Sequence, residues 1–156
     1  WELSRDSQRR LADSIAHCEM VVSSDVGDPD DVHPIEKKPI GERLALVALH
    51  QLYGKDVDWQ GPRVRQYTIL KNKIEVEYEH AKELKTSDGE ELRGFEIAGE
   101  DEIYHPAQPR IVGTTIELSS EQVPEPDYFR YGYQPYSEGN LIDENGLPAS
   151  TYASKL

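Results

Sequence analysis

The sequence has few of the features that would narrow its function at once. Only one of its 156 residues is a cysteine, Cys18, so no disulfide can form within the chain. No apolar stretch approaches the roughly 20 residues that a membrane span requires. Basic residues are a minority, with 17 Lys and Arg against 30 Asp and Glu. The net charge of −13 repels phosphate backbones and anionic lipids, which argues against nucleic acid and membranes as partners.

The first 60 residues read as helices around one strand. Residues 3–15 carry three apolar side chains roughly on one side, which predicts a short surface helix. The continuous apolar run CEMVVSS, 18–24, predicts a strand buried on both faces, as in a parallel sheet. Pro39 and Gly54 then bracket a second helix, because proline suits the first helical turn and glycine follows the last. This order is typical of a layered α/β fold.

The pattern changes near residue 61, where short strands begin. In KIEVEYEH, 73–80, apolar and acidic residues alternate with period two, as on a half-buried strand. Several such runs separated by turn signals predict a β-sandwich or jelly-roll-like module over 61–133. The tail, 134–156, is rich in proline, glycine and asparagine. It is expected either to dock on another surface or to be disordered.

The segment DPDDVHP, 28–34, crowds carboxylates around one histidine between the predicted strand and the second helix. An aspartate bonded to one imidazole nitrogen orients a general base, and Asp30 lies three residues before His33. The same loop could be an acidic cap at a helix N-terminus, where negative charge is favourable. It could also offer oxygen ligands to calcium, although it lacks the glycine and distal glutamate of a helix-loop-helix site. Four aspartates would then be the donors: Asp25, Asp28, Asp30 and Asp31. Spacing alone leaves these alternatives open.

Four separated blocks resemble the sialate O-acetylesterase family, whose members are SGNH-type serine esterases related to acetylxylan esterases. The longest is GDPDDVHPIEKKPIGERLALVALHQLYG, which is similar to the last catalytic block of that family. The others, which follow the family's order, are LSRDSQ with CEMVVSSDVGD, then LRGFEIAG, and finally GNLIDENGLPAS. The resemblance implies that residues 1–60 are the C-terminal part of a three-layer SGNH hydrolase domain. It also implies that the β-module follows and that 134–156 docks on the catalytic domain.

The same resemblance assigns roles to the loop. It makes His33 the general base of a Ser-His-Asp triad. Its acid falls on Asp30 in most SGNH enzymes but one residue later, on Asp31, in some relatives; we favour Asp30 and keep Asp31. Asp28 is interpreted as a loop or capping residue. No cofactor and no metal are implied.

The nucleophile is missing from this reading. The sequence has no Gly-x-Ser-x-Gly and no Gly-Asp-Ser motif. In the family the serine precedes the part that this chain resembles. Together with the start at Trp1, this leads us to expect a fragment whose partner is the N-terminal remainder of the enzyme.

The substrate implied is an acetylated sugar, most simply an O-acetylated sialic acid, in a secreted, periplasmic or lysosomal-type compartment. Two alternatives remain: an acetylxylan esterase of the same superfamily, or a non-catalytic carbohydrate-binding β-module. For the latter, a group of tyrosines offers faces that could stack on sugars, although their strand spacing is also typical of core residues. They are Tyr128, Tyr131, Tyr133 and Tyr136.

Overall fold

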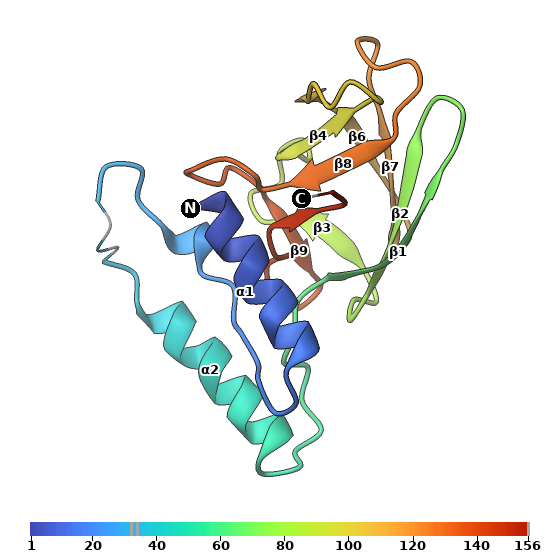
Figure 1. Ribbon diagram of the computed structural model, residues 1–156. Helices are drawn as coiled ribbons and strands as arrows, with labels where there is room; N and C mark the ends of the chain where they lie inside the picture. The colour runs from blue at the N-terminus through green and yellow to red at the C-terminus, as the bar shows by residue number, and fades with distance from the viewer. Residues whose placement is uncertain (32, 34, 156) are drawn as a thin grey trace.

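A computed structural model describes residues 1–31, 33 and 35–155 of the protein (Figure 1). Val32 and Pro34, which belong to the DPDDVHP segment, and Leu156, the end of the tail, lie outside the described residues. No described helix has the length and apolar character needed to cross a bilayer.

Both helices expected from the sequence are present. α1 spans Glu2–Ser14 and α2 spans Lys38–Gln51, with Pro39 in its first turn. Between them lies a short 3-10 helix, η1 (Ser24–Val26). In the view of Figure 1, α2 lies on the far side of α1 from the strands.

The strand predicted over residues 18–24 is wrong for this chain. Residues 18–23 have no regular secondary structure, and η1 begins at residue 24. A strand exists only through hydrogen bonds to a neighbour, and every strand pair among the described residues is antiparallel and lies elsewhere. The apolar run therefore has the composition of a buried strand but no sheet to join within this chain.

The rest of the chain forms short antiparallel strands, as the alternating patterns predict. Their bounds are β1 Arg63–Ile69, β2 Ile74–Glu79, β3 Leu84–Thr86, β4 Phe95–Ala98, β5 His105–Pro106, β6 Gln108–Val112, β7 Thr115–Ser119, β8 Tyr128–Tyr131, β9 Leu141–Asp143 and β10 Tyr152–Ala153. One four-stranded sheet has the order β1-β2-β7-β6 and the other β10-β8-β4-β5, while β3 pairs with β9. The tail thus supplies two strands, β9 and β10.

The two four-stranded sheets share one hydrophobic core, so we call residues 63–153 the β-sandwich. In β2, Ile74, Val76 and Tyr78 are buried, as the alternation of KIEVEYEH predicts. They belong to the same cluster as Phe95 of β4 and Phe129 of β8 in the facing sheet. Burial of these alternating side chains is what holds the sheets together.

Arginine side chains of α1 connect this helix to the β-sandwich. The Arg5 guanidinium donates to the backbone carbonyls of Gly132 and Gln134 and to the Thr151 hydroxyl. Arg10 donates to the carbonyl of Ala153 at 2.7 Å and is itself bonded to the fully buried Asp6. The apolar side of α1, by contrast, is exposed: Leu3, Leu11 and Ile15.

Candidate functional site

The loop that joins η1 to α2, residues 27–37, carries the residues singled out from the sequence; we call it the DPDDVHP loop. Its aspartates shape the backbone. The Asp28 carboxylate accepts a hydrogen bond from the Asp30 amide at 2.8 Å, and the Asp31 carboxylate accepts one from the His33 amide at 2.8 Å. Such side-chain-to-backbone bonds, two residues apart, are the usual way in which aspartate stabilises a tight turn.

The side chain of His33 is exposed, and so are those of Asp30 and Asp31. Among the described residues, no carboxylate lies within ion-pair distance of the His33 ring. The structure therefore brings the predicted base and both candidate acids into one exposed loop, but it does not bring Asp30 against the imidazole. The Asp31 carboxylate accepts the hydrogen bond from the His33 amide. The Asp30 carboxylate has no such bond among the described residues.

A buried arginine holds the two ends of this loop together. Arg43, on α2, donates to the carbonyl of Val22 at 2.7 Å and to both carboxylate oxygens of Asp25 at 2.7 and 2.6 Å. It is the one buried side chain of α2 among the described residues. Bidentate arginine–carboxylate pairs are geometrically specific, so this contact fixes where the loop leaves η1 and where it enters α2.

Sequence reasoning missed Arg43, and it had considered Asp25 only as a calcium ligand. No signal in the sequence singles out this pair, because Arg43 and Asp25 are 18 residues apart and a surface helix commonly carries several charged side chains. With Asp25 bonded to Arg43, the calcium alternative loses one of its donors. No three histidine, cysteine, aspartate or glutamate side chains within the described ranges converge as metal ligands would.

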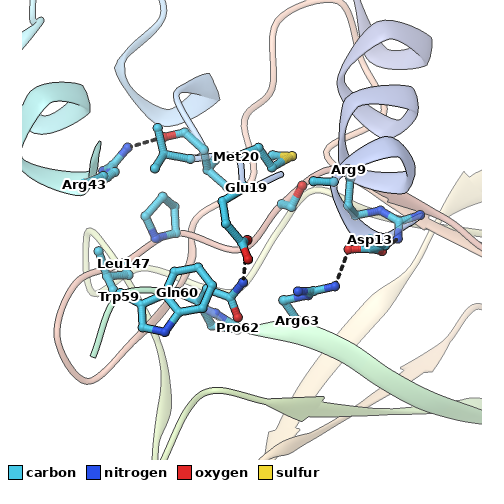
Figure 2. A pocket seen from close by; sticks show the side chains of 16 residues that line it. Arg9, Asp13, Glu19, Met20, Arg43, Trp59, Gln60, Pro62, Arg63 and Leu147 are labelled. Atoms are coloured by element: carbon cyan, nitrogen blue, oxygen red, sulfur yellow. Dashed lines mark hydrogen bonds and ion pairs between the residues drawn. The ribbon is translucent and has the colours of Figure 1, made fainter. Parts of the chain in front are cut away.

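A cavity lies where the N-terminal segments meet the β-sandwich, between α1, residues 19–22, residues 59–63 and residues 147–150 (Figure 2). Both charged and apolar side chains line it. Arg63 pairs with Asp13 of α1, and Gln60 donates to the Glu19 carboxylate. With a volume of about 60 Å³ the cavity holds water but not a sugar, since ligand sites measure about 300 Å³ or more. We interpret it as a packing joint.

The backbone of this joint is crowded. A Cβ built at Gly61 would lie 2.4 Å from the carbonyl oxygen of Pro148, so only glycine fits between the first strand and the tail.

Comparison with solved structures shows what this chain is similar to. The crystal structure of the carbohydrate acetylesterase XAC1771 from Xanthomonas citri matches 99% of this chain with a TM-score of 0.94 and 31% sequence identity. The chain spans 36% of the length of that protein. No protein-family model matches the chain, and no curated protein sequence matches it. The chain is therefore similar, in fold and in sequence, to about a third of a carbohydrate acetylesterase.

Proposed function

We propose that this chain is the C-terminal part of a serine esterase that removes O-acetyl groups from carbohydrate, and that it supplies the histidine and aspartate of the triad. The observation that carries the proposal is the similarity to a carbohydrate acetylesterase over nearly the whole chain. The exposed side chain of His33 supports it, because a base that serves a serine on another segment must be reachable from outside this chain.

The chemistry would follow the general pattern of serine esterases. His33 takes the proton of a serine hydroxyl as that oxygen attacks the acetyl carbonyl, and it then gives the proton to the departing sugar oxygen. In the second half it takes a proton from the water that attacks the acetyl-enzyme and returns that proton to the serine oxygen as acetate leaves. The partner carboxylate holds the ring in the productive tautomer and stabilises the imidazolium. No cofactor takes part.

Asp30 is our choice for that carboxylate, with Asp31 as the alternative. The Asp31 carboxylate already accepts a backbone hydrogen bond. The side chain of Asp30 is exposed, and the hydrogen bond of this residue to Asp28 is made by its backbone amide, not by its carboxylate. The contact between Asp30 and the ring would form when the loop meets the rest of the catalytic site.

The partner that provides the serine would be the N-terminal remainder of the same enzyme. α1 exposes apolar side chains, and Leu44 of α2 and Leu52, the residue that follows α2, are 53% and 80% exposed. Residues 18–23 have the composition of a buried strand and no strand partner among the described residues. A sheet edge of the remainder would pair with residues 18–23, and its helix surfaces would cover the exposed apolar side chains of the helices. Removing apolar surface from water is favourable.

The substrate would be an acetylated sugar, with O-acetylated sialic acid as the first candidate and acetylated xylan as the alternative. Enzymes of this kind act where glycans are accessible, so we place the protein in a secreted, periplasmic or lysosomal-type compartment.

Replacement of His33 in the complete enzyme tests the proposal. We expect His33→Ala to lower kcat for an acetylated sugar by about a thousandfold or more. His50→Ala, a histidine at the far end of α2, is the matched control and should stay near wild type. Asp30→Asn should lower kcat more than Asp31→Asn. Near-normal activity of His33→Ala would refute the assignment. Glycan binding by a wild-type protein that hydrolyses no acetyl ester would favour the carbohydrate-binding alternative.

A further inference from the structure

A polar hollow lies between the start of the DPDDVHP loop and the tail of the β-sandwich. It measures about 360 Å³, and its walls come from Asp25 of η1, from Arg93 before β4, and from residues 136–140 of the tail. Two structural units thus contribute to it, and sites for small molecules favour such junctions. Its volume is also within the range of sites that hold a ligand the size of a sugar.

The hollow is joined to the candidate catalytic loop by direct packing. A Cβ built at Gly27, the first residue of that loop, would lie 3.8 Å from Cε2 of Tyr136. Asp25, two residues earlier, lines the hollow and is fixed by Arg43. The larger groove beside His50 and Trp59, of about 490 Å³, lies at the other end of α2. A helix of 14 residues is about 21 Å long, so only the first hollow adjoins the loop.

The walls are held in place before any ligand binds. Asn140 is buried and donates to the Asp88 carboxylate at 2.9 Å and to the Glu91 carbonyl at 3.0 Å. The side-chain oxygen of Asn140, Oδ1, accepts a hydrogen bond from the Arg93 backbone amide at 3.0 Å. The Arg93 guanidinium is steadied by Asp88 at 2.6 Å.

The two chain segments that meet here also approach each other very closely. A Cβ on Gly94 would lie 2.7 Å from the Cα of Gly139. The blocks LRGFEIAG and GNLIDENGLPAS, far apart in the sequence, therefore meet at this hollow. Their contact fixes the position of the tail beside the loop.

The lining chemistry suits a sugar ring. Tyr136, one of the residues that line the hollow, is 42% exposed, so part of its ring is accessible to a ligand there. An aromatic ring accepts the apolar face of a pyranose, and charged and amide groups around it can bond the hydroxyls. The Arg93 side chain, 47% exposed, and the Ser137 hydroxyl lie at the same hollow.

We propose that this hollow is a subsite for a pyranose ring next to the ring that bears the acetyl ester, with Tyr136 as its stacking platform and Arg93 as its main polar contact. This inference rests on the proposed function and extends it, because it assigns part of the substrate recognition to the β-sandwich. It also explains why the tail returns to the η1 end of the molecule.

Kinetics of the complete enzyme on two kinds of substrate test the subsite. One substrate, p-nitrophenyl acetate, carries no sugar; the others are acetylated xylo-oligosaccharides and O-acetylated sialosides. Tyr136→Ala should lower kcat/KM for the sugar that occupies the hollow about tenfold more than it lowers kcat/KM for p-nitrophenyl acetate. Tyr136→Phe, which keeps the ring, should restore most of the difference. The set of sugars that shows the effect identifies the sugar class.

Tyr67→Ala is the matched control, because Tyr67 is a similarly exposed tyrosine on β1, outside the hollow. It removes the same atoms and lowers stability, but it should leave the ratio between sugar and p-nitrophenyl substrates unchanged. An equal effect of Tyr136→Ala on all substrates would overturn the subsite while leaving the esterase assignment intact. Should the enzyme hydrolyse no acetyl ester, chemical-shift changes at Gly139 and Asn140 upon titration with unacetylated oligosaccharides decide: their absence overturns the subsite.

Discussion

At the scale of single residues, the buried contact between Arg43 and Asp25 has the largest consequence for the candidate site. Three hydrogen bonds from the Arg43 guanidinium connect α2, which follows the DPDDVHP loop, to Val22 and Asp25, which precede it. Within the loop, the carboxylates of Asp28 and Asp31 accept hydrogen bonds from the loop's own backbone amides. The place where His33 stands relative to the rest of the protein therefore depends on this pair.

Arg43 should accordingly behave as a positioning residue. We expect Arg43→Met to lower kcat of the complete enzyme by about 10- to 100-fold, because small displacements of a catalytic group are costly, while KM changes little. Arg43→Lys keeps the charge and one hydrogen bond and should recover part of kcat. Steady-state kinetics of both variants measure this split.

An equal loss in Lys and Met variants that tracks only their thermal stability would contradict the positioning role. Lys38→Met is a suitable control, since Lys38 is an exposed cation on the same helix whose ion pair with Glu42 is exposed. Its kcat should equal that of the wild type.

At the scale of elements, periodicity located the helices and the alternating strand, but it does not show which surface each element buries. The sequence predicts a surface helix with Leu3, Leu11 and Ile15 roughly on one side; these side chains are 50–61% exposed, while Asp6 is fully buried. Likewise, the run 18–24 predicts a buried strand and forms none. Both differences have one physical reason, which is that burial depends on a partner surface that the local pattern does not reveal.

The candidate site was predictable to the same limited extent. Sequence placed His33, Asp30 and Asp31 in one loop because they are neighbours in the chain. It could not reveal the contact of Arg43 with Asp25, which are 18 residues apart, or that of Gly27 with Tyr136, which are more than a hundred residues apart. Such contacts depend on how elements pack, and no periodicity encodes them.

The Asp88 carboxylate, in the connection between β3 and β4, accepts a hydrogen bond from Asn140 of the tail. The pH dependence of this contact can be measured. The Arg93 guanidinium and then the Asn140 amide, by hydrogen bonds to Asp88, lower the pKa of its carboxyl from 3.8 to about 2. A carboxyl whose pKa is lowered on folding stabilises the native state fully above its unfolded pKa. That contribution is lost as the pH falls from about 4 through about 2.

We therefore expect Asp88→Asn to lower the melting temperature at pH 7, with the gap to the wild type closing between pH 4 and pH 2. Thermal unfolding followed by circular dichroism at pH 7, 4, 3 and 2 measures this. Asp56→Asn removes another exposed carboxylate and is the matched control; it should change the melting temperature at pH 7 much less than Asp88→Asn does. A gap for Asp88→Asn that persists unchanged at pH 2 would argue against the ion pair.

At the scale of the whole molecule, the two parts of the chain are packed very differently. The β-sandwich has a continuous core in which several side chains, among them Ile74, Ile97 and Phe129, are fully buried. α2 fully buries only Arg43 among the described residues; the helix also carries a stack of His50 on Trp59 and a hydrogen bond from Gln51 to Glu19. Such a helix draws little stability from the rest of this chain.

Amide hydrogen exchange should expose this difference and the surface that a remainder would cover. In this chain alone we expect the amides of α2 to exchange much faster than those of β4 and β8, because local opening of α2 breaks few buried contacts. In the complete enzyme the same helix should become protected, since Leu44 and Leu52 would then be covered, while β4 and β8 stay slow in both. Exchange of α2 that is already slow in this chain would mean that the helix needs no further partner. Exchange that stays fast in the complete enzyme would mean that the remainder packs elsewhere.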